Sequence, residues 1–405
     1  MGVRAHPRRV YGIQVQPSWP SRGSGRRVAG PVLTSALLGG CFSPAVAPGP
    51  DGAVSAWTIQ EPGDYLGILP GTPHTFDGVV AAIFLDSLVI VADEGARQVH
   101  AFSVRNRTRV WSRGGQGSRP GQFELLADVD RASAGRLVAL DAHLDRLTIF
   151  DATGELEAMV PLDLAPPDVE YTRVVGFCDG SFAIATQESG ASWSEPGVRR
   201  GESDYYRVDA GGALLNVLGR FPGEARLVTS EPRMIGSVPF GMRTMVAGDC
   251  KSLFVAEGSR FEVAALRPDG SRGRSVAPAE LPPQRVSSRD LAIYRRQIFL
   301  HVVPEALDGP MRQHLAQLDA PESFPAHRHL LVDTGGLIWL EEFPAGRSRV
   351  ARWFISADSG TPVATLRVDP RIRLVAASHD RVLGVETMPD GRERAALFAL
   401  TRWNR

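Results

Sequence analysis

Short apolar runs that end in an acidic residue recur along the chain and dominate its pattern of hydrophobic and polar positions. Each run is followed by a polar turn and by a second strand in which apolar and polar residues alternate. Turns rich in Asp, Pro and Gly come next, as at Asp151–Gly154 and Asp358–Gly360, and such turns reverse the chain. The pattern therefore predicts units of four short antiparallel strands. The runs are Val91–Asp93, Ala139–Asp141, Val255–Glu257, Trp339–Glu341 and Gly384–Glu386, with Ile184–Thr186 as a degenerate third copy.

The spacing of these six units predicts the fold class. Their last residues are 48, 45, 71, 84 and 45 positions apart, which is close to the length of a propeller blade except where loops are inserted. Four-stranded sheets arranged radially leave only short exposed edges. We therefore expect an all-β, six-bladed β-propeller. The expected blades are 74–115, 122–165, 170–222, 240–280, 325–369 and 371–403.

Three kinds of segment carry a resemblance to a known class. The hairpins Leu147–Gly154 and Arg267–Gly270, the apolar-acidic strand ends and the Gly-rich linker Gly114–Phe123 resemble those of NHL-repeat and related six-bladed β-propellers. The resemblance covers residues 57–403. The usual Asp-x-x-Asn-x-Arg signature of the class is reduced here to Asp93–Arg97, and the third copy lacks its acid.

Two segments lie outside the blade pattern. The strand-like segment 57–69 is expected to complete the last blade as a closing strand, because ring closure removes two exposed sheet edges. A helical insertion is expected at about 284–320, between blades four and five. In it, apolar residues recur at three and four positions from Ser287 to Val303, and a second helix is expected to begin at Pro310. The insertion is interpreted as packing at the rim in preference to a lid over one face.

The first 41 residues predict export. Six arginines and no acid precede an apolar stretch, Val28–Leu38, that is too short to remain in a bilayer as a spanning helix. Leu38–Cys41 resembles a bacterial lipobox, which implies lipidation of Cys41; export without lipid and a later translation start at Val28 are the alternatives. Residues 42–56 are expected to form a tether, and Phe42 favours an outer-membrane or surface location over the inner membrane.

Removal of this leader changes the charge of the protein. The full chain of 405 residues has 45 basic and 45 acidic residues, but the part from Cys41 keeps 39 basic residues against 45 acidic ones. A mature charge of about minus six, together with export and interleaved arginines, argues against nucleic acid as a partner. The mature chain keeps two further cysteines, Cys178 and Cys250. A disulfide is possible in an oxidising compartment, but two free and partly buried thiols are the favoured interpretation.

The repeat acids form the most obvious constellation of candidate site residues. Propellers that act as lactonases hold calcium on the axis with acidic and amide side chains, so a calcium site is one hypothesis. The favoured interpretation is structural ion pairing, because an arginine follows within one hairpin in several units: Arg97, Arg146, Arg260 and Arg394. The acids are Asp93, Asp141, Glu257, Glu341 and Glu386.

Other candidates are weaker. His327 and His329 are two residues apart, but no third zinc ligand stands at motif spacing, so they are interpreted as surface histidines. Asp128, Asp130, Asp249 and Asp333 are the acids expected nearest the channel mouth. The long loop of the third blade, residues 187–204, is the preferred contact surface; it carries Trp193, Glu195, Arg199 and Arg200.

These features favour a binding or protein-interaction module, monomeric, without a catalytic residue or a metal, and anchored to the cell envelope by its N-terminal lipid alone. The ligand is an unidentified protein or small molecule. The alternative is an exported, metal-dependent propeller hydrolase or lyase of the lactonase type, with calcium as its cofactor. No nucleophile-elbow, zincin or phosphate-loop motif occurs in the sequence. Propellers host unrelated functions, so the fold alone does not decide between the two.

Overall fold

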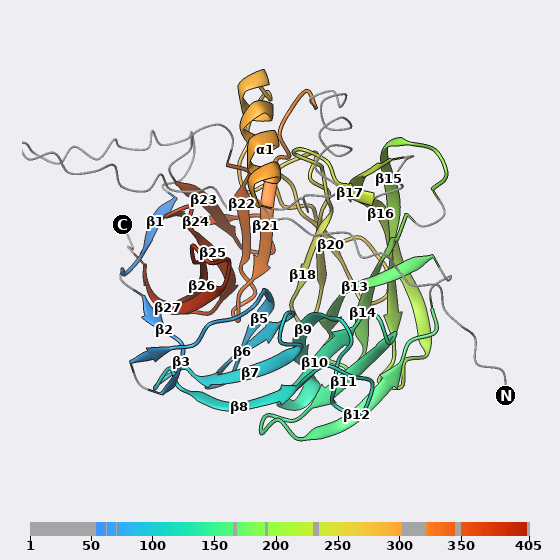
Figure 1. Ribbon diagram of the computed structural model, residues 1–405, viewed down its shortest axis with the longest axis vertical. Helices are drawn as coiled ribbons and strands as arrows, with labels where there is room; N and C mark the ends of the chain where they lie inside the picture. The colour runs from blue at the N-terminus through green and yellow to red at the C-terminus, as the bar shows by residue number, and fades with distance from the viewer. Residues whose placement is uncertain are drawn as a thin grey trace, which may run out of the picture.

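The computed structural model describes residues 54–402, apart from 62, 70, 165–167, 191–192, 230–234, 302–320 and 345–349. The described chain is almost entirely β-structure and has a propeller-like arrangement, with sheets placed around a common axis (Figure 1). The predicted signal segment, residues 42–53 of the predicted tether and the second predicted helix lie outside the described residues. The last two residues of the predicted tether, Ser55 and Ala56, belong to strand β1 (Ser55–Ile59).

The first two sheets each contain four antiparallel strands in chain order. Each strand pairs with the next through a tight turn, as the apolar runs and Asp/Gly turns of the sequence predict. The strands of the first sheet are β5 (Val79–Leu85), β6 (Leu88–Asp93), β7 (Gln98–Ser103) and β8 (Arg109–Gly114). Those of the second are β9 (Leu126–Ala132), β10 (Arg136–Asp141), β11 (Arg146–Phe150) and β12 (Leu156–Pro161), with a short 3₁₀ turn η1 (Ser133–Gly135).

The next two sheets depart from four regular strands. The third has five strands because β15 and β16 form a long hairpin that extends past the rest of the sheet. The fourth has three strands, and bridges from Val263 to Val276 and from Leu266 to Arg272 add a short fourth segment. The strands are β13 (Val169–Gly176), β14 (Phe182–Glu188), β15 (Gly197–Val208), β16 (Leu214–Val228), β17 (Ile235–Ser237), β18 (Met245–Gly248), β19 (Leu253–Ala256) and β20 (Ala264–Leu266).

The N-terminal strand joins the last two groups of strands into one nine-stranded sheet. β1 pairs in parallel with β24 and antiparallel with β27. The members are β21 (His327–Val332), β22 (Ile338–Glu342), β23 (Ala351–Ser356), β24 (Pro362–Val368), β25 (Ile372–Ala377), β26 (Arg381–Thr387), β27 (Glu393–Arg402), β1 (Ser55–Ile59) and β2 (Asp64–Tyr65).

β1 and β2 therefore run along β27, the last strand of the chain, as a closing strand requires. Trp57 is opposite Arg402, and Tyr65 is opposite Ala396. The indole of Trp57 is buried and lies 5.7 Å from that of Trp339, measured between ring centroids. Residues 67–69 do not continue this pairing; they form a small hairpin of β3 (Gly67–Leu69) with β4 (Thr72–Pro73). The predicted closing role holds for the strands β1 and β2.

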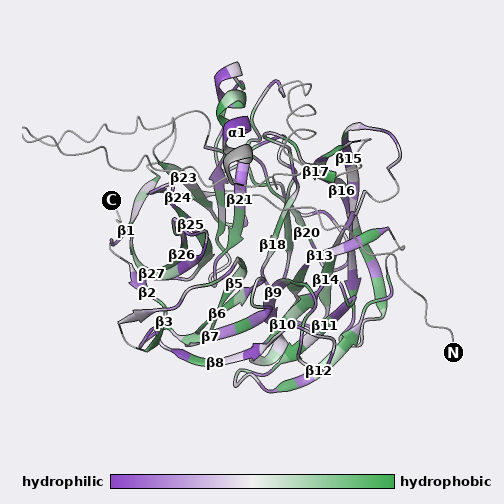
Figure 2. Ribbon diagram, in the orientation of Figure 1, coloured by the Kyte–Doolittle hydropathy of each residue, from purple (hydrophilic) through white to green (hydrophobic). Residues whose placement is uncertain are grey.

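The first strand of each group faces the axis. β5, β9, β13, β18, β21 and β25 contact one another in this order, and β25 contacts β5, so the strands form a closed circle (Figure 1). The apolar core is divided into wedges between successive sheets. In one wedge, for example, Ile90 and Ala101 of the first sheet pack with Leu137 and Phe150 of the second. Figure 2 shows hydrophobic stretches on the strands that supply these wedges.

The predicted helix is present as α1 (Ser288–His301). Ser287 and Asp290 form a reciprocal N-terminal cap: the backbone NH of Ser287 donates to the Asp290 carboxylate, and the Asp290 NH donates to the Ser287 hydroxyl. Tyr294 of α1 packs in an aromatic cluster with Phe240, Phe324 and Phe343. Figure 1 shows α1 at the periphery of the ring, so its described part packs at the rim.

Candidate binding site in the axial channel

The circle of first strands encloses a cavity of about 1820 Å³. Consecutive residues of every first strand line it, for example 127–131 of β9 and 328–332 of β21. Each of these strands has a neighbour in its own sheet on one side only. Its other edge therefore carries backbone NH and CO groups that need partners from water or from side chains.

Three acids in the channel satisfy such edge groups. Asp128 of β9 accepts from the Val174 NH of β13 at 3.0 Å, and Asp130 accepts from the Gly176 NH at 3.0 Å. Glu393 accepts from the Val79 NH of β5 at 2.7 Å. Asp128 and Asp130 thus link the first strands β9 and β13, and Glu393, which lies on β27, links the last sheet to β5. Burial raises the pKa of Asp128, and raises the pKa of Asp130 to about 7.

Four arginines from different parts of the ring converge on one region of the cavity. Arg173 lies on β13, Arg328 on β21 and Arg373 on β25, and Arg243 precedes β18. Burial lowers the pKa of His329 well below its usual value, and the charges of all four guanidinium groups lower it further. His329 is therefore neutral and surrounded by positive charge.

The four guanidinium groups differ in how they are paired. Arg173 binds Asp128 at 2.9 Å, and Arg373 binds Glu393 at 3.0 Å. Arg243 donates to the backbone carbonyl of Arg328 at 3.2 Å. Within the described residues, the guanidinium of Arg328 has neither a hydrogen bond nor an ion pair within 4 Å.

A buried carboxyl group lies beside this cluster. Glu341 of β22 is opposite His329 of β21 and Trp353 of β23 in the sheet. Its Oε2 is 3.8 Å from His329 Nε2, and the His329 ring stacks on Trp353. Burial raises the pKa of Glu341 to about 7, although nearby arginines lower it. A partly protonated Glu341 leaves some of the arginine charge uncompensated near neutral pH.

The first strands share a local irregularity that places side chains in the channel. Five of them contain a β-bulge, in which one residue has no partner in the register of the next strand. A bulge turns a side chain out of the regular alternation of a strand. All five bulged residues line the cavity: Val80, Ala127, Thr172, Arg328 and Val375.

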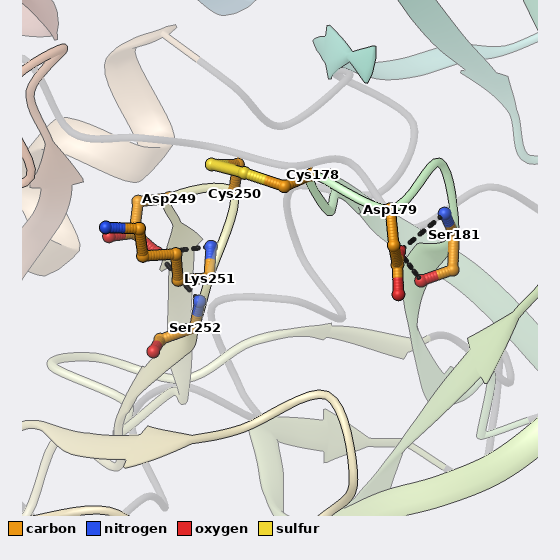
Figure 3. Close-up of a disulfide and its surroundings, with 7 residues drawn as sticks. All are labelled: Cys178, Asp179, Ser181, Asp249, Cys250, Lys251 and Ser252. Atoms are coloured by element: carbon orange, nitrogen blue, oxygen red, sulfur yellow. Dashed lines mark hydrogen bonds between the residues drawn. A yellow bond between two sulfur atoms is a disulfide. The ribbon is translucent and has the colours of Figure 1, made fainter.

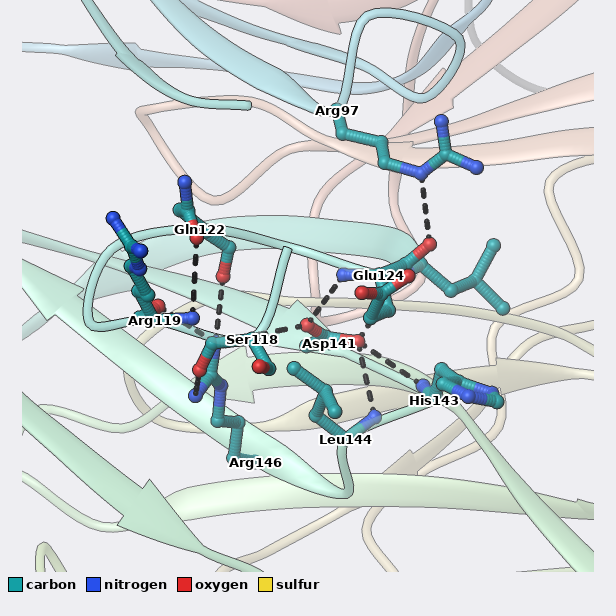
Figure 4. A network of polar contacts seen from close by, with 10 residues as sticks. Arg97, Ser118, Arg119, Gln122, Glu124, Asp141, His143, Leu144 and Arg146 are labelled. Atoms are coloured by element: carbon teal, nitrogen blue, oxygen red, sulfur yellow. Dashed lines mark hydrogen bonds and ion pairs between the residues drawn. The ribbon is translucent and has the colours of Figure 1, made fainter. Parts of the chain in front are cut away.

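The predicted repeat acids do not meet at one site. Asp141 is fully buried and accepts four backbone hydrogen bonds, from the NH groups of Glu124, Leu125, His143 and Leu144 (Figure 4). Asp93 likewise accepts from Asp77 and Ala96. Each of these two acids binds two segments of its sheet: the linker before the first strand and the turn after the second strand. In the described part of the chain, no group of three or more His, Cys, Asp or Glu residues is placed to hold a metal ion.

The expected acid–arginine pairs occur in two of the four places. Arg146 lies 4.0 Å from Asp141, and Arg394 lies 3.0 Å from Glu386. Arg97 donates instead to the backbone carbonyl of Glu124 (Figure 4). Glu257 is exposed, and the sequence-based ion pair with Arg260 is absent among the described residues.

Two expectations about histidine and cysteine change. His327 is buried, not at the surface: its Nε2 accepts from the Gly258 NH at 2.8 Å, and burial lowers its pKa to about 4. The favoured interpretation of two free thiols is wrong. Cys178 and Cys250 form a disulfide that joins the β13–β14 turn to the β18–β19 turn (Figure 3). The backbone NH of Cys178 also donates to the Cys250 carbonyl.

The other sequence candidates take part in local structure. Asp249 and Asp333 each accept backbone NH groups of their own hairpin turn, and neither lines the cavity. The predicted long loop, residues 187–204, contains the end of β14, the connection between β14 and β15, and the first part of β15, which pairs with β16.

Its predicted contact residues bind neighbours within the fold. The Trp193 indole donates to Glu188, and Arg199 pairs with Glu195. Arg200 donates to the carbonyls of Gly223 and Glu257.

Comparisons with known proteins add little to this geometry. No family model and no curated protein sequence matches the chain. Among solved structures, it is similar to regucalcin, a calcium-binding protein of Agrobacterium tumefaciens, at 12% identity and a TM-score of 0.45, covering 86% of this chain and 97% of that one. A Xanthomonas campestris gluconolactonase gives 12% identity and a TM-score of 0.43 over 86% and 98%. The aldose sugar dehydrogenase of Streptomyces coelicolor, bound to PQQ, gives 10% and 0.44 over 86% and 100%.

Similarities at this level of identity and TM-score do not assign a function. The described chain also contains no helix that is long and apolar enough to cross a membrane.

Asp141 and Glu257 provide a test of the structural role of the repeat acids. Replacing Asp141 by Ala removes the acceptor of four backbone NH groups, so we expect a loss of about 3 kcal/mol or more in unfolding free energy. Glu257→Ala, at the exposed equivalent position, is expected to change it by less than about 0.5 kcal/mol. Urea unfolding of the two variants measures both effects. Equal losses would contradict the assigned roles.

Glu341 predicts a pH dependence of stability. Its folded-state pKa of about 7 lies above its ordinary value of 4.5, so the folded protein binds this proton more tightly than the unfolded chain does. The contribution of Glu341 to stability is therefore present at low pH and lost as pH rises from about 4.5 through about 7. The Gln side chain of the Glu341→Gln variant cannot titrate. The unfolding free energy of this variant minus that of the wild type should therefore increase as pH rises from about 4.5 to about 7. Parallel pH profiles for the two proteins would refute the assignment.

Proposed function

We propose that this chain is an exported, lipid-anchored, six-bladed β-propeller that binds a small solute in its axial channel. The observation that carries the proposal is the cavity of about 1820 Å³, which the first strands of all sheets line and in which several charged side chains converge. Ligand sites of this kind combine a concave surface with a few placed polar groups.

The blade count is supported by the circle of first strands. Six of them contact one another in sequence, and each begins a run of strands that pair in chain order. In this interpretation the nine-stranded sheet is two blades, β21–β24 and β25–β27, and β1 is the outer strand of the second. The six repeat units in the sequence have the same order. A relation to the NHL-repeat class is part of the proposal.

The geometry supports binding more than calcium-dependent hydrolysis. A hard cation needs six to eight oxygen ligands, several of them from carboxylates. The channel acids Asp128, Asp130 and Glu393 already accept hydrogen bonds from backbone NH groups of neighbouring strands, and two of the three also bind arginine. The residues present do not fit a calcium site, and no catalytic step through a metal is derived for them.

A survey of solutes tests the binding function. Purified mature protein is screened by thermal shift and calorimetry against sets of small anionic, neutral and cationic solutes, with calcium and a lactone substrate in parallel. We expect at least one solute set to bind and to be blocked by Thr334→Trp, since Thr334 is exposed and lines the cavity. Thr361→Trp, in an exposed turn away from the cavity, is the control. Calcium-dependent lactone hydrolysis, or no binding in any set, would defeat the proposal.

The anchor is tested separately. Cys41 follows a basic segment and a short apolar stretch, and Phe42 occupies the position where Asp would favour the inner membrane. We expect a palmitate analogue fed to cells to label the wild-type protein, and Cys41→Ala to abolish the label. An unlabelled wild type, or a label that survives the substitution, would rule out lipidation at this residue.

A further inference from the structure

The bulge position of β21 differs in chemistry from its four counterparts. Val80, Ala127, Thr172 and Val375 occupy the bulges of the other first strands, and none of them carries a charge. A bulge in this fold therefore does not require a cation. Arg328 stands at the β21 bulge, where its side chain lines the channel.

The surroundings of Arg328 do not neutralise it. Its guanidinium lies outside ion-pair distance of any described acid, whereas the other arginines of the cluster have acceptors in the fold. Burial lowers the pKa of Arg243, and the charges of Arg173 and Arg328 lower it further, whereas Glu224 and Glu341 raise it. The acids thus compensate Arg243 in part, and Arg328 lies close enough to Arg243 to repel it. Like charges held together in a channel are unfavourable unless an anion compensates them.

Glu341 is poorly suited to be that anion. It is buried on β22 behind His329, and its pKa of about 7 means that it is neutral in a large share of molecules near neutral pH. The groups that face it are His329 and Arg328 from β21, Arg243 from the segment before β18, and Arg373 from β25. Three cations and a neutral imidazole thus surround a carboxyl group that holds its charge weakly.

We propose that Arg328, with Arg243 and Arg173, binds an oxyanion group of a small acidic solute in the axial channel. This inference rests on the proposed binding function and specifies the class of ligand. A guanidinium group offers two parallel NH donors to two oxygens, which suits a carboxylate, sulfate or phosphate group. The unpaired guanidinium of Arg328 donates these two NH groups to the ligand. Arg243 and Arg173 keep their bonds within the fold and contribute positive field.

The charge cluster also predicts proton uptake on binding. The arginines lower the pKa of Glu341 because they stabilise its ionised form. An anion bound at the cluster opposes that stabilisation, so Glu341 becomes easier to protonate when the site is filled. Binding should therefore take up a proton near pH 7 and weaken as pH rises. A site elsewhere in the channel would show no such dependence on Glu341.

The probes are succinate, sulfate and inorganic phosphate, with glycerol as the neutral and putrescine as the cationic comparison. Calorimetry on the mature protein at low salt is expected to show binding of at least one anion and none of glycerol or putrescine. Arg328→Gln should weaken it by about tenfold or more, because it removes a charged hydrogen-bond donor. Arg328→Lys, which keeps the charge and loses the planar fork, should give an intermediate affinity.

Arg367→Gln is the matched control, since Arg367 is exposed on β24 and does not line the cavity. It should leave affinity unchanged. The guanidinium of Arg328 has no hydrogen bond or ion pair among the described residues, so Arg328→Gln should not lower the melting temperature. Calorimetry in buffers of different ionisation enthalpy should reveal proton uptake in the wild type and none in Glu341→Gln.

The outcomes separate the two proposals. Binding of glycerol or putrescine, but of no anion, with sensitivity to Thr334→Trp would leave the binding function standing and overturn the oxyanion site. Anion binding that is equal in wild type and Arg328→Gln would also overturn it. Failure of every solute to bind the wild type would refute the binding function itself. The relative affinities for succinate, sulfate and phosphate identify which oxyanion the site prefers.

Discussion

The structure depends on how the inner edges of its sheets are satisfied. A first strand in a radial sheet has a hydrogen-bonding neighbour on one side, and its other edge faces the channel or the next sheet. Side chains from neighbouring sheets supply part of what is missing. Asp128 and Asp130 reach from β9 to β13, and Glu393 reaches β5. The ring is thus held together at its centre by carboxylate-to-backbone hydrogen bonds as well as by the apolar wedges farther out.

This use of acids determines the electrostatics of the channel. Asp128 and Glu393 each accept a backbone NH group and also pair with an arginine, so part of their charge and acceptor capacity is used within the fold. Arg328 differs from these acids because its side chain does not bind the backbone of a neighbouring strand in the described part of the chain. It lies at the bulge of β21, and its guanidinium is unpaired among the described residues. A chain in which acidic and basic residues balance therefore has a local cluster of arginines in its interior. The net charge of the chain carries no information about this region.

Much of the fold follows from local sequence pattern. The strand ends, the Asp/Gly turns, the closing strands β1 and β2 and the capped helix at Ser287 all follow from local signals, and the structure contains each of them. The candidate site is a different matter. Arg328 lies between His327 and His329, which attract attention as potential metal ligands, and an arginine in a strand gives no signal of its own. Its significance arises from a bulge and from arginines up to 155 positions away in the chain, at Arg173. The burial of His327 depends in the same way on a hydrogen bond from Gly258 in another sheet.

The disulfide has a topological consequence for the third sheet. Cys178 and Cys250 are 72 positions apart, so the chain between them forms a covalent loop that contains most of that sheet, including the long β15–β16 hairpin. Extended hairpins at the surface are where proteases tend to cut. A single cut inside this loop would leave two polypeptides that remain linked through sulfur. The two pieces would thus migrate as one molecule after such a cut, and the break would become apparent only after reduction.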